Sequence, residues 1–527
     1  MGTYFHNGTI WCGYRSYANS LRIDQALIVE LDGAPASNDQ IVDLDGGFLS
    51  PTFIDGHAHP LFAGREAQGP QVNGLQTVAE IVNEVRRFAE ENPTAPWIIG
   101  GAYEASIIER GDFLTTWLDD AVNDRPVVLQ AVDHHTIWVN SKALTIAGIT
   151  SATPDPAGGG IARNHDGSPR GTLREPSAIE LVMKHMPPRT IEDDVAAIKW
   201  ASDRYLECGV TAATDAWVEP GMAEAYREAE KSGQLGIDIN LFLLAQPDSW
   251  RDRIEYFKEI RAQVEGLGES SQLKARTIKI ICDGALSSGT AALLEPYLDD
   301  PSSTGLLIWH DEELLEAALI FDRLGFQLHM HAIGDAAVRQ ALNTIEKVKE
   351  INPHWDRRPV IAHAQLIHPS DLPRFKTLDV IANYQPLWSY LDPMNKELIA
   401  PRIGELRNNN QYQLASMVKT GARISYGSDW PVTSQIPLMA LGVPTHRQPP
   451  TGDSAPWSPE ESISVEESLS FYTYGAAYQN YDDERCGQLK LGMAANLLHL
   501  EHNPLDIDPL KIPSIRIINT YKDGIAL

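Results

Sequence analysis

Cysteine is scarce in this sequence, and the few thiols stand far apart. The four cysteines among 527 residues are Cys12, Cys208, Cys282 and Cys486, and none belongs to a CxxC pair. Such a chain lacks both the disulfide framework of small secreted domains and the paired cysteine ligands of a zinc finger. The sequence therefore predicts a fold stabilised by its hydrophobic core in a reducing compartment, and we expect a cytoplasmic protein.

Basic residues and long apolar stretches are also in short supply. The 43 Lys and Arg residues stand against 71 Asp and Glu residues, which gives a net charge of -28. An acidic surface repels phosphate backbones and anionic lipid headgroups. No stretch approaches the ~18 apolar residues that span a bilayer, and the amino terminus lacks a basic segment followed by an apolar one. We therefore expect a small-molecule substrate, with neither nucleic acid nor membrane as a partner.

Short apolar runs alternate with longer helical patterns over most of the chain. This alternation is typical of a parallel α/β sheet, and no GxGxxG turn marks a dinucleotide-binding open sheet. Eight runs can be counted, the number that closes a (β/α)8 TIM-type barrel. They are FLSPTFIDGHAHP (48–60), VVLQAVD (127–133), GVTAATDAW (209–217), TIKIICDG (277–284), QLHMHAIGD (327–335), PVIAHAQ (359–365), VIANYQ (380–385) and RISYGSDW (423–430).

The two chain ends differ in character from the middle. Residues 1–52 and 485–527 contain brief apolar runs between Gly, Asn, Asp and Pro turn signals. We expect these ends to form one small β-sandwich domain beside a barrel at 53–484. The stretch from about 61 to 205 is too long for one connection between strands. It predicts an insertion with its own helices, among them TVAEIVNEVRRFAEEN.

Several candidate metal ligands follow the ends of the predicted strands. His57 and His59 lie two residues apart, so on a strand their side chains project from one face toward a shared point. An isolated HxH pair is also compatible with packed or solvated histidines. However, His331, His363 and Asp429 follow later strands, at the end where barrel enzymes assemble their sites. Imidazole and carboxylate ligands together suit zinc or another divalent transition metal.

Lys279 is unexpected within the apolar run TIKIICDG. A buried ammonium without a partner is costly, and it would repel a nearby cation. A lysine that has reacted with carbon dioxide carries a carbamate, an anionic oxygen ligand that can bridge two metal ions. An ion pair with Asp283 or another acid would also neutralise the ammonium. The residues alone leave both alternatives open.

Five motifs together resemble the amidohydrolase superfamily, specifically the branch that contains N-substituted formamide deformylases. They are FLSPTFIDGHAHP, the lysine of KIICDG, HAIGDAAV, VIAHAQ and YGSDWPV, and their order runs through nearly the whole chain. The resemblance implies one metal site, with His57 and His59 on the first strand, a carbamylated Lys279 as the bridge, His331 and His363 on the fifth and sixth strands, and Asp429 on the eighth. It also suggests a homodimer.

Weaker candidates lie beside these motifs. His135 matches a histidine that this branch places after its second strand, where it would act as a catalytic residue on the substrate carbonyl; a packed or surface histidine is the alternative. His134 is a weaker candidate than His135. His329 faces the same way as His331 but one layer deeper, where a hydrogen-bonded core histidine is expected. Asp335 is expected to cap the helix that follows it. The candidate pocket-lining residues are Tyr103, Glu104, Glu175, Trp388 and Trp430.

The candidate ligands predict a hydrolase. A divalent metal lowers the pKa of bound water toward neutrality, so that hydroxide is available as the nucleophile. Asp429 would accept the proton of the water and pass it to the leaving amine. Zinc, as one or two ions, is the default metal, and iron, manganese and cobalt are alternatives.

The resemblance implies that the scissile bond is the C–N bond of an amide or formamide-like small molecule. Ester, lactone or phosphoester hydrolysis is an alternative, because the metal-activated hydroxide does not itself choose the electrophile. A non-catalytic binding protein is a further alternative, which the filled ligand positions disfavour.

Overall fold

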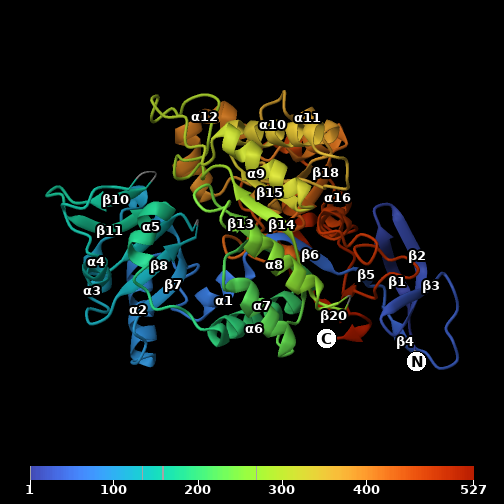
Figure 1. Ribbon diagram of the computed structural model, residues 1–527. Helices are drawn as coiled ribbons and strands as arrows, with labels where there is room; N and C mark the ends of the chain where they lie inside the picture. The colour runs from blue at the N-terminus through green and yellow to red at the C-terminus, as the bar shows by residue number, and fades with distance from the viewer. Residues whose placement is uncertain (1, 133, 157–158, 269) are drawn as a thin grey trace. The chain divides into compact units, whose positions relative to one another are not determined.

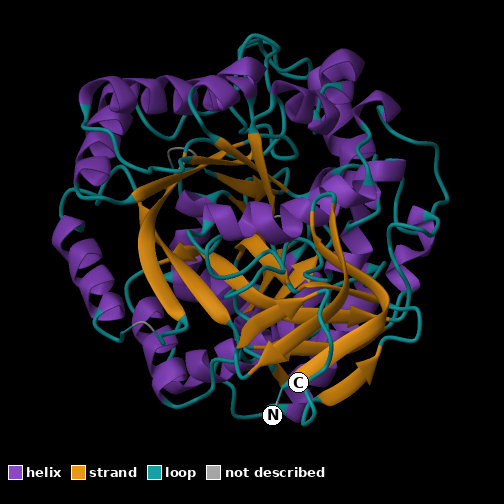
Figure 2. Cartoon of the chain, turned by 90° about the vertical axis from the view of Figure 1, so that its right-hand side faces the viewer, coloured by secondary structure: helices purple, strands orange, loops and turns teal. Residues whose placement is uncertain are grey.

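The computed structural model describes residues 2–132, 134–156, 159–268 and 270–527 (Figures 1 and 2). Its residue contacts divide the chain into two compact units. Unit 1 comprises Met1–His59, Ala201–Trp430 and Ser434–Leu527, and unit 2 comprises Pro60–Trp200 and Pro431–Thr433. Each unit contains sheet structure of its own.

The central element of unit 1 is a parallel sheet of eight strands. In sheet order they are β6 (Phe53–Ala58), β12 (Val210–Val218), β13 (Asp238–Ala245), β14 (Leu273–Ile281), β15 (Gln327–Ala332), β16 (Val360–His363), β17 (Ile381–Tyr384) and β18 (Arg423–Tyr426). Every neighbouring pair is parallel. The strands read as nearly continuous apolar runs because a parallel sheet is covered on both faces.

Backbone hydrogen bonds also connect the first and last strands of this sheet just beyond their ends. The Asp429 amide donates to the His57 carbonyl at 2.7 Å, and the His59 amide donates to the Trp430 carbonyl at 2.7 Å. The sheet is therefore a nearly closed barrel, as the sequence predicted.

One of the eight predicted barrel strands was wrong. The run VVLQAVD forms β8 (Val127–Ala131), which belongs to the sheet of unit 2, and Asp133 at its end lies outside the described residues. The missing barrel strand is β13, with the sequence DINLFLLA. A short apolar run in the barrel and one in the unit 2 sheet have the same periodicity, so the pattern does not distinguish β13 from β8. β13 also has no polar motif at its end to mark it as a barrel strand.

Helices connect the barrel strands in alternation. Those between β12 and the chain end are α7 (Met222–Lys231), α8 (Ile254–Glu265), α9 (Asp311–Arg323), α10 (Asp335–Ile351), α11 (Leu372–Thr377), α12 (Ala400–Asn409), α13 (Leu414–Thr420), α14 (Pro437–Ala440), α15 (Val443–His446), α16 (Val465–Ser470) and α17 (Ala476–Gln479). In α10, for example, Val338, Ala341 and Ile345 recur on one buried face. None of the described helices is both long and apolar enough to cross a membrane.

The expectation that Asp335 caps α10 was wrong. Gly334 is the N-cap, and Asp335 is the first residue inside the helix. Its carboxylate accepts a hydrogen bond from the Leu294 amide at 2.9 Å. A negative charge at this position still complements the positive end of the helix dipole.

Both chain ends contribute to a second sheet of unit 1. Its order is β21 (Ile525–Ala526), β20 (Ile517–Lys522), β19 (Leu497–Leu500), β5 (Phe48–Pro51), β1 (Thr3–Gly13), β2 (Ser16–Asp24) and β3 (Leu27–Leu31), with β4 (Gln40–Asp43) beside β1. Phe5, Leu21, Leu497 and Tyr521 share its core. The two ends therefore meet in one sheet; a two-layer β-sandwich is not confirmed, and the expected domain boundaries remain predictions.

Unit 2 contains a smaller mixed sheet of five strands. Their order is β10 (Gly160–Arg163), β11 (Pro169–Arg174), β9 (Thr136–Val139), β8 and β7 (Ile98–Tyr103). The expected helix within TVAEIVNEVRRFAEEN is α2 (Val78–Glu91), which begins after a capping box formed by Thr77 and Glu80. The other helices between β6 and β12 are α1 (Pro60–Ala67), α3 (Thr115–Asp119), α4 (Ser141–Ala147), α5 (Pro176–Met183) and α6 (Ile191–Glu207).

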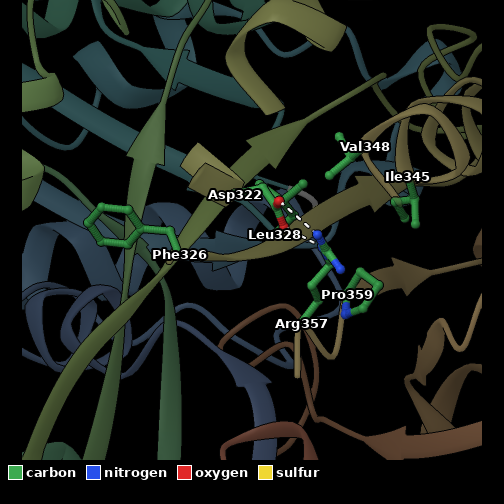
Figure 3. A pocket seen from close by; sticks show the side chains of 7 residues that line it. All are labelled: Asp322, Phe326, Leu328, Ile345, Val348, Arg357 and Pro359. Atoms are coloured by element: carbon green, nitrogen blue, oxygen red, sulfur yellow. Dashed lines mark hydrogen bonds and ion pairs between the residues drawn. The ribbon is translucent and has the colours of Figure 1, made fainter. Parts of the chain in front are cut away.

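A small cavity between α9, α10 and β15 is shown in Figure 3. It is lined by Asp322, Phe326, Leu328, Ile345, Val348, Arg357 and Pro359. Its volume of about 10 Å³ is space for about one water molecule. The Arg357 guanidinium donates from Nε to Asp322 Oδ1 at 2.7 Å, so the polar groups of this cavity satisfy each other. The cavity is too small for a substrate.

Candidate metal centre

The barrel brings His57, His59 and Asp429 together. His59 Nε2 lies 3.1 Å and His57 Nε2 lies 3.4 Å from Asp429 Oδ1. One ligand atom from each of the three residues lies within 4.8 Å of the other two. Two imidazole nitrogens and a carboxylate oxygen at this spacing fit a divalent transition metal.

His363 and His331 extend this cluster along the strand ends. His363 is the last residue of β16, and its ring centroid lies 4.9 Å from that of His57. The His331 ring on β15 lies 4.6 Å from the His363 ring. His331 Nε2 lies 3.4 Å from the Gly284 carbonyl oxygen. His363 and His331 are therefore ring neighbours of the cluster at the carboxyl ends of the strands, whereas His57, His59 and Asp429 are the described residues whose ligand atoms converge within 4.8 Å.

Lys279 projects from β14 into the same cluster. Its Nζ atom lies 3.4 Å from His57 Nε2, and the residue is only 2% exposed. No carboxylate oxygen in the described ranges lies within 4.0 Å of its ammonium group. Asp283, the ion-pair partner considered from the sequence, accepts hydrogen bonds from the backbone amides of Ile333 and Gly334. Burial lowers the pKa of Lys279 to about 7, which favours the neutral amine.

The protonation states of the other residues also suit metal binding. Burial, together with the charge of Lys279 whenever its amine is protonated, holds the pKa of His57 well below its usual range, and burial lowers the pKa of His363 to about 4. Burial opposes ionisation of Asp429, but hydrogen bonds with His57 and His59 hold its pKa well below the usual range. Metal ligands must be deprotonated, so neutral imidazoles and an ionised carboxylate are the required forms.

Two neighbouring side chains fix the orientation of the imidazole rings. His329 Nε2 lies 2.8 Å from His57 Nδ1, and Gln385 Oε1 lies 2.8 Å from His363 Nδ1. The Nε2 atoms of both rings are therefore left to face the centre, an arrangement usual for metal-binding histidines. His329 is the buried, hydrogen-bonded histidine that the sequence predicted. Gln385 was missed; its position directly after the strand VIANY was the only signal available.

Comparison with known proteins agrees with this geometry. Residues 40–525 match the amidohydrolase family. The chain belongs to this family. It is 30% identical to Protein LONG AFTER FAR-RED 3 of Arabidopsis thaliana, over 98% of this chain and 90% of that protein. It is 26% identical to an N-substituted formamide deformylase of Arthrobacter pascens, over 94% of this chain and 91% of that protein.

A solved structure supports the same assignment. An uncharacterized metal-dependent hydrolase from Pyrococcus furiosus is 25% identical, with a TM-score of 0.73, and the match covers 97% of this chain and 100% of that one. This amidohydrolase is therefore a metal-dependent hydrolase, and a divalent metal is implied. The donor set of His57, His59 and Asp429 fits such an ion.

Two glycines allow the first and last barrel strands of this amidohydrolase to approach each other. A β-carbon on Gly427 would lie 2.4 Å from the His57 backbone nitrogen, and one on Gly56 would lie 2.7 Å from the Tyr426 carbonyl oxygen. Both distances are too short for any side chain, so glycine is required where the backbones meet. This close approach explains the glycine in each of the motifs GSDW and DGHAH.

The remaining candidates divide between the two units. Trp388 stacks on the His363 ring, with centroids 5.4 Å apart and an interplanar angle of 4°, so it borders the centre. The Trp430 ring packs edge-on against Tyr205 at 5.1 Å. In unit 2, His135 Nδ1 lies 3.0 Å from Glu175 Oε2.

Three further candidates also belong to unit 2. His134 Nε2 lies 3.2 Å from Glu66 Oε1. The Glu104 carboxylate accepts from the Ser106 amide at 2.9 Å and so caps a short turn. Tyr103 is buried in the unit 2 core. A catalytic role for His135 stays a prediction, because it belongs to unit 2 whereas the candidate metal ligands belong to unit 1.

Proposed function

We propose that this amidohydrolase cleaves the C–N bond of an amide or formamide-like small molecule. The observation that carries the proposal is the convergence of His57, His59 and Asp429 within 4.8 Å at the carboxyl ends of the barrel strands. The choice of a C–N bond is supported by the similarity to an N-substituted formamide deformylase over 94% of this chain.

The residues that would hold the metal are the three of this cluster with His331, His363 and a carbamylated Lys279. Zinc is the first choice, as one or two ions, because imidazole and carboxylate ligands suit it. Carbamylation joins the Lys279 amine nitrogen to the carbon of carbon dioxide and releases one proton. The neutral amine favoured by burial is the form that can make this bond.

A divalent ion bound there would polarise the substrate carbonyl and lower the pKa of a water molecule. The protein contributes the proton transfers. Asp429 is ionised and lies within 3.4 Å of two histidine nitrogens, so its free electron pairs face the centre. It accepts a proton from the attacking water as the C–O bond forms, and it returns that proton to the amine nitrogen as the C–N bond breaks.

A substrate panel tests the proposal. Purified enzyme is assayed with N-formyl and N-acyl amines and with esters, lactones and phosphoesters of matched size. We expect turnover of amides, with amine and carboxylate as products, and a loss of about 10²-fold or more in kcat for Asp429→Asn. Asp379→Asn, which changes a more exposed acid paired with Arg423, is the control and should leave kcat unchanged. Turnover restricted to esters or phosphoesters would reject C–N cleavage.

A further inference from the structure

Asp55 lies on β6, two residues before His57, and takes no part in the chemistry proposed above. The residue is 2% exposed and its carboxylate accepts four hydrogen bonds. Oδ1 accepts from the backbone amides of Ser428 at 2.9 Å and His57 at 3.3 Å. Oδ2 accepts from the Ser428 hydroxyl at 2.5 Å and the Tyr205 hydroxyl at 3.1 Å.

Two of these four donors belong to Ser428, the residue directly before Asp429. The Ser428 hydroxyl oxygen in turn accepts a hydrogen bond from the Trp430 amide at 3.0 Å. A continuous chain of hydrogen bonds therefore runs from Asp55 through Ser428 to both sides of Asp429. The chain connects strand β6 to the turn that follows β18.

This turn needs such support because Asp429 has a left-handed backbone, with φ of 57°. Residues with a side chain rarely adopt this conformation, and when they do the surrounding structure must hold them in it. The conformation directs the Asp429 carboxylate to within 3.1 Å of His59 Nε2 and 3.4 Å of His57 Nε2.

We propose that Asp55 is a positioning residue, which holds Ser428 and thereby places the Asp429 carboxylate between His57 and His59. The inference rests on the proposed function, since it assigns Asp55 to the assembly of the same centre. It is a different role from that of Asp322, a buried acid on α9 whose carboxylate accepts hydrogen bonds from Asn352, Trp355 and Arg357 in the segment that follows α10.

Zinc affinity provides the test, because it does not depend on finding the substrate. The dissociation constant of each protein for Zn²⁺ is measured by competition with a chromophoric chelator, after metal removal and in the presence of bicarbonate. Outer partners of metal ligands typically contribute about 10- to 100-fold in affinity. We expect Asp55→Ala to weaken zinc binding within that range.

Matched variants separate positioning from general destabilisation. Asp55→Asn keeps an oxygen acceptor for the Ser428 amide and should lose less affinity than Asp55→Ala. Ser428→Ala should weaken binding, and the double variant Asp55→Ala with Ser428→Ala should lose less than the product of the two single effects, because both break one chain. Asp322→Asn should lower the melting temperature and leave zinc affinity unchanged.

The outcomes are distinct. If Asp55→Ala and Ser428→Ala both bind zinc as tightly as the parent protein, Asp55 only stabilises the fold and the proposal is overturned. The same holds if Asp322→Asn weakens zinc binding to the same extent. A parent protein that binds zinc but cleaves no amide rejects the proposed function alone, and the comparison of the variants still decides the role of Asp55.

Discussion

Gln385 shows how a neutral side chain controls a candidate metal ligand from outside the centre. Its Oε1 atom accepts from His363 Nδ1, and its own amide donates to Asn383 Oδ1 at 3.0 Å. Gln385→Leu keeps a similar side-chain volume but removes the acceptor. We expect the dissociation constant for Zn²⁺ to rise about 10-fold or more. Gln340→Leu, at a buried glutamine that bonds the Trp309 carbonyl, is the control; equal affinity in both variants would contradict the role of Gln385.

We expect the rate at which Lys279 becomes carbamylated to depend on pH. Burial lowers the pKa of its amine to about 7, so the neutral, reactive fraction rises as the pH rises through 7. That fraction is about one-tenth at pH 6 and about nine-tenths at pH 8. At fixed carbon dioxide pressure, carbamate formation on the metal-free protein should therefore be about 10-fold faster at pH 8 than at pH 6, as followed by ¹³C NMR with labelled carbon dioxide.

The control for this prediction is another lysine on the same strand. Lys274 lies on β14 but pairs with Asp482, so Lys274→Ala should leave the labelled signal in place. Lys279→Ala should abolish it. A carbamate signal that persists in Lys279→Ala, or a formation rate that does not change with pH, would show that the buried amine is not the reacting group.

The candidate ligands could be picked out from the sequence because their side chains have few other reasons to follow apolar strands. Asp429 Oδ1 lies 3.1 Å from His59 Nε2 and 3.4 Å from His57 Nε2, so these three candidates meet at one place. Asp55 and Gln385 could not be assigned roles from the sequence. Their function depends on which distant residue their oxygens meet, and Ser428 lies 373 positions from Asp55.

At the scale of elements, the connection from α9 to the segment after α10 depends on one buried ion pair (Figure 3). Asp322 accepts from Arg357, from the Trp355 indole at 2.9 Å and from the Asn352 amide at 2.8 Å. Removing one partner leaves a buried charge, so Arg357→Ala should lower the free energy of unfolding by about 3–5 kcal/mol.

Urea unfolding followed by tryptophan fluorescence measures this loss. Arg251→Ala removes an arginine that is half exposed and pairs with Glu313 and Glu316 at the surface. It should cost at most about 1 kcal/mol, because solvent screens such pairs. An equal decrease in the free energy of unfolding in Arg357→Ala and Arg251→Ala would mean that the buried pair of Asp322 and Arg357 stabilises the fold no more than a surface pair does.

A motif at the strand end helped to place several barrel strands correctly, whereas β12 and β17 were placed from their apolar runs alone. β15, β16 and β18 each lead into a polar group that must lie at the barrel mouth, which fixes both their type and their direction. β8, a run of five residues, leads into the candidates His134 and His135, whereas β13, a run of eight residues, has no candidate ligand at its end; the histidines therefore favoured the wrong strand. Only their pairing partners distinguish them, and pairing is a tertiary property.

At the scale of the whole molecule, the centre depends on barrel closure. His59 and Asp429 are 370 positions apart and meet because the first and last strands are joined by backbone hydrogen bonds beyond their ends. The sheet formed by the two chain ends adds a second connection, in which β5 pairs with β19 immediately before β6 begins. The sequence indicated that the two chain ends could share one sheet, which they do, but the expected two-layer sandwich is not confirmed, because short strands of this kind pair in several ways. The count of eight strands indicated barrel closure although one of the counted runs lies in unit 2.

Metal stoichiometry tests the central claim most directly. Elemental analysis is carried out on the purified protein and on the variants Lys279→Ala, Asp429→Ala and Lys274→Ala. We expect one or two equivalents of a divalent transition metal, most of it zinc, in the parent and in Lys274→Ala, and a clear decrease in Lys279→Ala and Asp429→Ala. No bound metal in the parent protein after purification with added zinc and bicarbonate would contradict a metal centre at these residues.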